Sequence, residues 1–332
     1  MGERGSVFLL SDYGSSDEFA GVMRAVVQRV APGAPMVDLT HEVPMFDVRA
    51  GSLALERALP YLGPGVVLAV VDPGVATERR AVAVEAGSAS GPAYLVGPDN
   101  GLLARSAALL GGPRRVVALR RPAAERATGL RSSFDGRDVF APAAASLWSG
   151  SSLGDLGQEV DPGSLVKLAP PFLEVAGDSL TAEVLWIDRF GNVQLAAREA
   201  DMLAAGLSGP GAIASVSVLP ASAGGIAPGT QWLQAVWTSS FAGIASGALG
   251  LIVDANGHLS LACREASAAD VLGLTEARVV VVRAAGPNAA GPNAAGPNAA
   301  GPNAAGPTVG GKSPGEPNRA VEEPGGGQWR AP

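Results

Sequence analysis

The chain has 332 residues, 47% of them hydrophobic, which is enough for two globular domains with buried cores. Its formal net charge of -7 argues against a nucleic-acid partner, because phosphate binding requires a clustered excess of Lys and Arg. The lone cysteine, Cys263, excludes an internal disulfide, and the two histidines are too few for a conventional zinc site, so we expect no metal.

The sequence does not indicate membrane insertion or export. No apolar run approaches the roughly 20 residues that a membrane-spanning helix requires. The first four residues lack a signal-peptide pattern, so we expect a cytoplasmic protein. The acidic balance suits a cationic ligand, although most mildly acidic proteins gain only solubility from it.

Strand-like and helical runs alternate from the start of the chain to about residue 148. The predicted strands are 7–10, 36–39 and 66–71, and the predicted helices are 17–30, with Ser16 as N-cap, and 47–59. The second and third strands are apolar and rich in β-branched residues, so we expect them to be buried on both faces. The alternation predicts an α/β domain with a central, mostly parallel sheet between helices. Ligands bind beyond the carboxyl ends of such strands, where Asp12 and Asp72 fall.

The character of the sequence changes after about residue 170. Short apolar runs at 182–187, 214–219, 249–253 and 259–262 are separated by Gly, Pro and Asn turns, which predicts a small all-β domain. The last segment repeats Gly-Pro-Asn and continues through Gly- and Pro-rich sequence, so we expect it to be disordered. The predicted divisions are an α/β domain at 1–170, a β domain at 171–283 and a tail at 284–332.

Short motifs that combine acidic residues with glycine supply the first candidate site residues. Asp12 closes the first strand, where a carboxylate can accept both hydroxyls of a ribose or can cap a turn. Asp17 can pair with an ammonium group or stabilise the first turn of its helix. Asp72 begins a Pro-Gly turn that should expose its carboxylate. With Arg79 it can orient a water molecule or form a solvated salt bridge.

Two further motifs lie later in the chain. Asp135 stands between Phe134, which offers an aromatic face, and Gly136, which lets the backbone approach a ligand closely. Turn formation alone explains these residues equally well. Asp188 and Asn192 flank a predicted turn between strands and offer acceptors and amide donors suited to an amino-acid head group. A plain hairpin turn is the alternative there.

The histidines and the missing sequence motifs narrow the possible chemistry. We expect His41 to be a structural residue rather than a base, and His258 to be exposed in a turn. The sequence has no Walker loop, no Gly-x-Gly-x-x-Gly after the first strand and no Gly-x-Ser-x-Gly elbow. Nucleoside-triphosphate, dehydrogenase and serine-hydrolase chemistry are therefore not expected.

Six motifs occur in a fixed order and together are more specific than any one of them. They lie at 12–17, 38–41, 71–75, 97–101, 136–142 and 188–192. In these motifs the chain, from about residue 7 to 282, resembles the S-adenosyl-L-methionine (SAM) hydrolase (adenosine-forming) family. These enzymes are also called SAM hydroxide adenosyltransferases and are related to the fluorinase and chlorinase enzymes. The resemblance implies an N-terminal α/β domain, a C-terminal β-barrel and a homotrimer whose sites lie between neighbouring subunits.

The resemblance also implies roles for seven residues that contact SAM. These are Asp12 at the ribose hydroxyls, Phe46 beside the adenosyl group, Asp17, Asp188 and Asn192 at the methionine moiety, and Ser133 and Phe134 at the reaction centre. The implied reaction is attack of water or hydroxide on the ribose C5′, giving adenosine and L-methionine. Because the sulfonium is already an activated leaving group, neither a metal nor a redox cofactor is expected.

The residues that would place the nucleophile match the family only in part. In the hydrolases an Asp-Arg-His set positions the nucleophile, and Asp72 and Arg79 match two of its members. Asp135 stands where the family has His; it can accept a hydrogen bond from water or act as a base, and it can equally reduce activity. Two alternatives therefore stay open: a SAM-dependent adenosyl-halide synthase, and a SAM- or adenosine-binding protein with weak or no catalysis.

Overall fold

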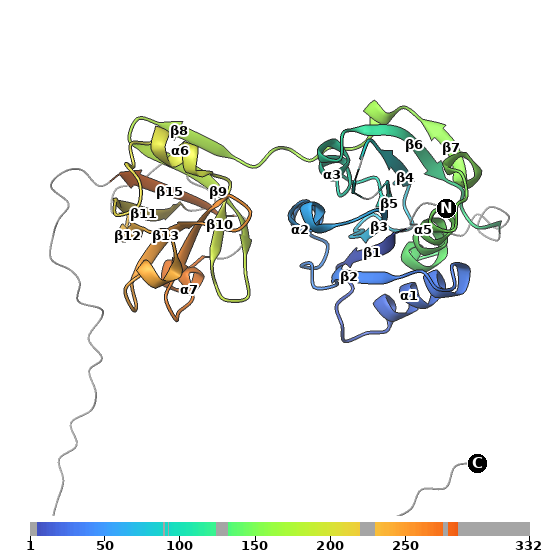
Figure 1. Ribbon diagram of the computed structural model, residues 1–332, viewed down its shortest axis with the longest axis horizontal. Coiled ribbons are helices and arrows are strands. Elements are labelled where there is room, and N and C mark those ends of the chain that lie inside the picture. Colours follow the sequence, from blue (N-terminus) through green and yellow to red (C-terminus); the bar gives the residue numbers. More distant parts are fainter. Residues whose placement is uncertain are drawn as a thin grey trace, which may run out of the picture. The chain divides into compact units, whose positions relative to one another are not determined.

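A computed structural model describes residues 5–88, 90–91, 93–123, 132–219, 230–274 and 278–284 (Figure 1). The described chain forms an N-terminal α/β domain and a C-terminal β-barrel, as predicted. The tail predicted from residue 284 lies outside the described residues, except for Ala284, which ends the last strand.

A seven-stranded sheet forms the centre of the N-terminal domain. Its strands are β1 (Ser6–Ser11), β2 (Met36–Thr40), β3 (Gly65–Val70), β4 (Ala81–Ala86), β5 (Tyr94–Pro98), β6 (Pro113–Leu119) and β7 (Gly157–Val160). They lie in the order β2-β1-β3-β5-β4-β6-β7. Strands β2, β1, β3 and β5 are mutually parallel, and β6 runs in the same direction. Strands β4 and β7 run in the opposite direction. The sheet is therefore mostly parallel, and β1 and β3 end side by side.

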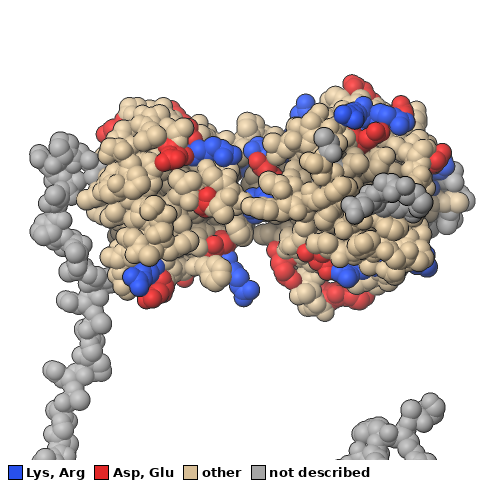
Figure 2. All heavy atoms as spheres, in the orientation of Figure 1, with Lys and Arg blue, Asp and Glu red and all other residues tan. Residues whose placement is uncertain are grey.

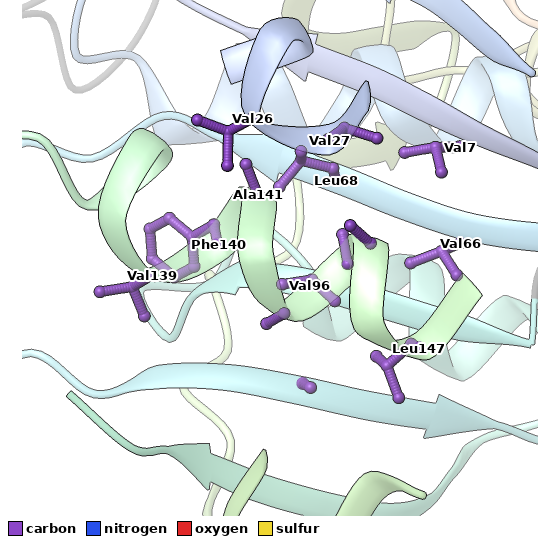
Figure 3. Packing of buried hydrophobic residues seen from close by; sticks show 14 of the residues in the cluster. Val7, Val26, Val27, Val66, Leu68, Val96, Val139, Phe140, Ala141 and Leu147 are labelled. Atoms are coloured by element: carbon purple, nitrogen blue, oxygen red, sulfur yellow. The ribbon is translucent and has the colours of Figure 1, made fainter. Parts of the chain in front are cut away.

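Helices cover both faces of this sheet. They are α1 (Phe19–Val30), α2 (Val48–Ala58), α3 (Ala104–Leu109) and α5 (Ala141–Trp148), and a π-helical turn over Gly136–Phe140 leads into α5. Strand β1 alternates between the two faces: Val7 and Leu9 pack with α1 and α5, whereas Phe8 and Leu10 pack with α2 and α3. Figure 3 shows the first of these cores, in which side chains of α1, α5 and the strands interlock.

Seven strands of the C-terminal domain close into a barrel. The strands of this domain are β8 (Leu173–Ala176), β9 (Ser179–Ile187), β10 (Val193–Leu195), β11 (Ile213–Leu219), β12 (Leu233–Trp237), β13 (Leu249–Val253), β14 (Leu259–Cys263) and β15 (Val279–Ala284). The order β10-β14-β13-β12-β11-β15-β9 closes through pairing of β10 with β9, and β8 adds to β9 outside the ring. Trp237 and Leu180 belong to the barrel core, and short helices α6 (Glu199–Ala204) and α7 (Ala268–Leu272) complete the domain.

Two sequence predictions about local structure were wrong. The first helix begins at Phe19 rather than residue 17, Glu18 occupies the N-cap position, and Ser16 does not cap it. Residues 15–18 instead form bends that lead from β1 into the helix. Strand β2 is not buried on both faces, because it is the edge strand of the sheet and most of its residues are exposed or half-exposed.

No helix in the described ranges combines the length and apolar character needed to cross a membrane. On the face shown in Figure 2, Lys and Arg side chains are interspersed with Asp and Glu. Charge alone therefore does not mark a ligand site on that face.

Truncating Phe140 should destabilise the α/β domain strongly. Its side chain is fully buried in the core shared by α1 and α5, so Phe140→Ala should lower the free energy of unfolding by about 3–5 kcal/mol. Denaturant unfolding followed by circular dichroism measures this loss. Phe241→Ala removes a ring that is 49% exposed and should cost much less; equal losses would contradict the burial argument.

Candidate active site

A pocket of about 380 Å³ lies at the edge of the sheet where β1 and β3 end. Seven of the ten residues predicted for the site line it: Asp12, Asp17, Phe46, Asp72, Ser133, Phe134 and Asp135. Because Ser11 pairs with Val70 in parallel register, the loops after both strands leave the sheet together. This register brings Asp12 and Asp72 to one cavity, as the sequence pattern predicted.

Asp12 contacts the segment that carries Phe46. The backbone N–H of Phe46 donates to Asp12 Oδ2 at 2.9 Å. Phe46 has a φ of 66°, which is uncommon for a bulky residue, and its side chain is exposed at the pocket. Burial raises the pKa of Asp12, and the Phe46 N–H opposes that shift only in part. Asp12 therefore holds the left-handed turn that presents the Phe46 ring.

Asp72 and Arg79 form a buried, two-pronged ion pair. Arg79 Nε donates to Asp72 Oδ1 at 3.1 Å, Arg79 Nη2 donates to Asp72 Oδ2, and both side chains are more than nine-tenths buried. The prediction that the turn exposes the Asp72 carboxylate was wrong, since Arg79 folds back over it. Burial raises the pKa of Asp72, with Arg79 opposing the shift and Asp135 adding to it. The pair is thus a desolvated group at the pocket rather than a solvated surface bridge.

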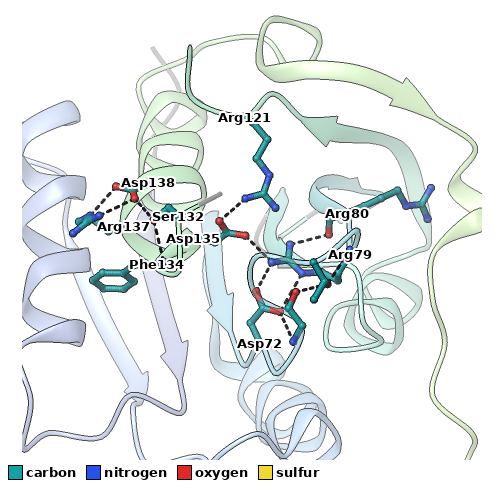
Figure 4. A network of polar contacts seen from close by, with 11 residues as sticks. Asp72, Arg79, Arg80, Arg121, Ser132, Phe134, Asp135, Arg137 and Asp138 are labelled. Atoms are coloured by element: carbon teal, nitrogen blue, oxygen red, sulfur yellow. Dashed lines mark hydrogen bonds and ion pairs between the residues drawn. The ribbon is translucent and has the colours of Figure 1, made fainter. Parts of the chain in front are cut away.

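Asp135 joins this pair through the same guanidinium. Its side chain is 1% exposed, and its Oδ2 accepts from Arg79 Nη2 at 2.7 Å. Its Oδ1 accepts from Nη1 of a second arginine, Arg121, at 2.5 Å. Figure 4 shows the resulting chain of alternating charges, Asp72, Arg79, Asp135 and Arg121. The phenyl ring of Phe140 lies 5.4 Å from the Arg79 guanidinium carbon.

Arg121 was missed in the sequence because no motif surrounds it. Strand β6 runs antiparallel to β4, so the residues after β6 lie beside those that precede β4. Arg121 follows β6 and Arg79 precedes β4, which brings both to Asp135. The pairing of β4 with β6 is the signal that would have found Arg121, and it is not readable from local sequence.

Aromatic side chains form one wall of the pocket. Tyr13, Phe19 and Phe134 contact one another, with ring centroids 5.2–5.9 Å apart. Burial, followed by the charges of Asp12 and Asp72, raises the pKa of Tyr13, so its hydroxyl stays protonated. Neither Tyr13 nor Phe19 was predicted to line the site, although Tyr13 lies inside the first motif.

His41 supports the loop that carries Asp12 and has the structural role that we expected. Its Nδ1 is 2.7 Å from the buried Ser11 Oγ, and its Nε2 is 3.2 Å from Asp38 Oδ1. Its carbonyl oxygen also accepts from the N–H of Gly14 at 2.7 Å. These bonds fix both ends of the segment after β1.

Asp188 and Asn192 lie in the β9–β10 hairpin of the barrel and do not line the pocket described above. Asp188 Oδ1 accepts from the N–H groups of Phe190 and Asn192, and its Oδ2 accepts from Asn192 Nδ2 at 2.8 Å. The turn residue Gly191 has a φ of 79°, and a Cβ there would lie 2.1 Å from Ser267 Oγ. In the single chain these residues therefore build a hairpin turn.

Two other polar residues have structural roles. Asp99 follows β5, but its carboxylate binds Arg80 and the Val166 N–H instead of lining the pocket. The prediction that His258 is solvent-exposed was wrong: it is half-buried, its Nδ1 lies 3.2 Å from the Leu195 carbonyl oxygen, and burial lowers its pKa. Across the part of the chain that the structure describes, no group of three or more His, Cys, Asp or Glu is placed to hold a metal ion.

Comparison with known proteins identifies the family. The SAM hydroxide adenosyltransferase N-terminal domain matches residues 7–157, and the C-terminal domain of the same family matches residues 182–281. The (R)-S-adenosyl-L-methionine hydrolase of Salinispora tropica is 42% identical over 265 residues, which cover 80% of this chain and 92% of that protein. The enzyme of the same name from Salinispora arenicola is 49% identical over 187 residues, covering 56% and 70%.

More distant likenesses agree with this assignment. A crystal structure of an uncharacterized conserved protein from Thermotoga maritima superposes with a TM-score of 0.70 at 29% identity, covering 83% of this chain and 99% of that one. A fluorinase of an Actinoplanes species is 25% identical over 231 residues, which cover 60% of this chain and 74% of that enzyme. Since the two family domains account for most of the chain and relatives align over most of their own length, the chain belongs to the SAM hydroxide adenosyltransferase family.

Proposed function

We propose that the protein hydrolyses S-adenosyl-L-methionine to adenosine and L-methionine. The observation that carries the proposal is the desolvated Asp72–Arg79 pair at the same pocket as Asp12 and Phe46. The names of the two Salinispora relatives support it, and they specify the (R) form of the substrate. We therefore include the (R) form as a substrate of this protein.

The pocket residues divide into two groups by role. Asp12 accepts the ribose hydroxyls, Phe46 lies beside the adenosyl group, Ser133 and Phe134 line the reaction centre, and Asp17 pairs with the methionine ammonium group.

The second group places the nucleophile. Asp72, held by Arg79, accepts a hydrogen bond from the attacking water, and Asp135 supports this arrangement through Arg79. The acidic lining suits a substrate that carries a sulfonium and an ammonium group.

The reaction then needs little beyond positioning and desolvation. The water oxygen forms a bond to C5′ while the C5′–S bond breaks, and that electron pair leaves with the methionine sulfur as a neutral thioether. The proton lost by the water passes to the Asp72 carboxylate and then to solvent. Holding the water in line with the C5′–S bond replaces an unfavourable bimolecular encounter. No metal or redox cofactor takes part in this scheme.

Assembly and location complete the proposal. We assign Asp188 and Asn192 to the methionine moiety of a substrate bound by a neighbouring subunit in a homotrimer. The exposure of Phe190, between them in the hairpin, is compatible with a partner at this turn. Analytical ultracentrifugation together with Asn192→Ala, which should weaken SAM binding, tests this arrangement. We place the protein in the cytoplasm, where SAM is available.

Product analysis tests the function directly. The purified protein is incubated with each sulfonium epimer of SAM, and adenosine and methionine are followed by chromatography. In H₂¹⁸O, attack on C5′ puts the label in the 5′-hydroxyl of adenosine. Absence of both products at high enzyme concentration would overturn the proposal, and binding without turnover would indicate a SAM-binding protein. Added halide should yield no 5′-halo-adenosine, because carboxylates at Asp72 and Asp135 repel an anion.

Turnover should depend on pH through Asp72. Burial raises the pKa of Asp72 above its ordinary value of 3.8, and the reaction needs its charged form. We therefore expect kcat to fall as the pH drops through this raised pKa. Protonation of Asp72 favours the folded state, a contribution that is full below pH 3.8 and is lost as the pH rises, so this group does not cause acid unfolding. A kcat that stays constant to below pH 3.8, with folding checked by circular dichroism, would contradict the assignment.

A further inference from the structure

A second arginine stands behind the residues that place the water. We propose that Arg121 is a positioning residue for the reaction, acting on Asp72 through Asp135 and Arg79. The inference rests on the proposed hydrolysis and adds a fourth residue to the machinery. Its basis is the continuous series of contacts in Figure 4, in which Asp72 contacts Arg79, Arg79 contacts Asp135, and Asp135 contacts Arg121.

The first argument is electrostatic. Asp72 and Asp135 both accept a hydrogen bond from one nitrogen, Nη2 of Arg79, and both carboxylates are buried. Two buried carboxylates that share one cation repel each other, and one of them would take up a proton. Arg121 supplies the second positive charge through its contact with Asp135 Oδ1. Arg121 therefore adds a second positive charge next to the two carboxylates, which favours the ionised form of Asp72.

The second argument is geometric. Asp135 uses one oxygen for each arginine, so its carboxylate is fixed from two sides. Arg79 is in turn held by Asp135, by Asp72 and by the Arg80 carbonyl oxygen, which accepts from its Nη1 at 3.1 Å. Without Arg121, Asp135 can rotate and draw Arg79 away from Asp72, because the nitrogen that they share lies between the two carboxylates.

Arg121 acts indirectly, through these neighbours. Among the described residues it is not one of those that line the pocket, whereas Asp72 and Asp135 are. Its side chain is 18% exposed, so its charge is largely desolvated and interacts strongly with Asp135. A residue in this position should affect turnover more than substrate binding, because the orientation of water matters mainly in the transition state.

Steady-state kinetics of four variants test the inference. Arg121→Gln should lower kcat about 10- to 100-fold, the usual effect of losing a charge-assisted hydrogen bond, with KM within about threefold of the wild type. Arg121→Lys keeps the charge and should recover kcat to within about fivefold of the wild type. In an Asp135→Asn background, Arg121→Gln should cost less than about threefold, because the carboxylate that it serves is gone.

Arg115→Gln is the matched control. Arg115 lies on β6, the strand that precedes Arg121, and forms exposed ion pairs with Glu85 and Glu159, so its loss should leave kcat and KM unchanged. Unfolding measurements on all variants separate a loss of folded protein from a loss of turnover.

Each outcome decides the question. An Arg121→Gln variant that keeps the wild-type kcat would overturn the inference, as would an equal kcat loss in the presence and absence of the Asp135 carboxylate. A loss explained entirely by unfolding would overturn it too. Failure of the wild type to form adenosine would instead overturn the proposed function, so the two failures are distinguishable.

Discussion

Replacing Asp72 by asparagine should lower kcat by about 10²- to 10⁴-fold, the range associated with losing a positioned acceptor for a proton in the transition state. Asparagine keeps the size of the side chain and one acceptor oxygen but removes the negative charge. Arg79 keeps its contact with Asp135, so the fold around the pocket should persist. The affinity for SAM should change by less than about tenfold, because the water contact strengthens mainly in the transition state. Single-turnover kinetics and calorimetric binding measure the two effects separately.

Asp178→Asn provides the matched control for this substitution. Asp178 is exposed in the turn between β8 and β9, and its backbone oxygen accepts a hydrogen bond from the Ala284 N–H; its side chain forms no hydrogen bond or ion pair with the described part of the chain. Its side-chain amide should leave turnover and binding unchanged. Equal losses of kcat and SAM affinity in Asp72→Asn would mean that Asp72 binds the substrate and does not place the water.

Local sequence patterns were sufficient to predict the position of site residues that come directly after strands. Asp12 and Asp72 could be assigned to one edge because parallel strands end together, and hydrophobic runs mark where those strands lie. The hairpin at Asp188 was predictable for the same reason, since turn residues separate two apolar runs. The functional roles came from the resemblance, because a carboxylate after a strand is equally suited to a turn.

Features of the site that depend on contacts between distant segments could not be predicted from local sequence. Arg121 lies beside Arg79 and Asp135 because β6 pairs with β4, and the paired residues of these strands are 27 to 36 positions apart in the chain. The exposure of β2 likewise depends on its place at the sheet edge; Asp38 and Thr40 interrupt its apolar residues, whereas the buried central strand β3 has no polar side chain. The burial of Asp72 depends on Arg79 folding back over the turn, which turn chemistry alone does not specify.

The charges of Asp135 and Arg121 offset each other next to the pocket. In this chain Asp135 brings a negative charge into a desolvated position, and Arg121 offsets it. Arg121 and Asp135 thus form one charge pair beside the Asp72–Arg79 pair.

Asp12 offers the second large effect, on substrate affinity. Asp12→Asn can still accept the Phe46 N–H but replaces one acceptor oxygen by a donor, so KM for SAM should rise about 10- to 100-fold, as expected for charge-assisted bonds to ribose hydroxyls. Asp12→Ala should raise KM further, because it also releases the left-handed turn at Phe46. Comparing SAM with its 2′-deoxy analogue isolates the ribose contact. The wild type should bind SAM much more tightly than its 2′-deoxy analogue, whereas Asp12→Asn should bind the two with similar affinity. The deleted hydroxyl and the deleted carboxylate oxygen are the two partners of the same hydrogen bond, so removing the second costs little once the first is gone. Undiminished discrimination by Asp12→Asn would assign the ribose to another residue and leave Asp12 with only its role at Phe46.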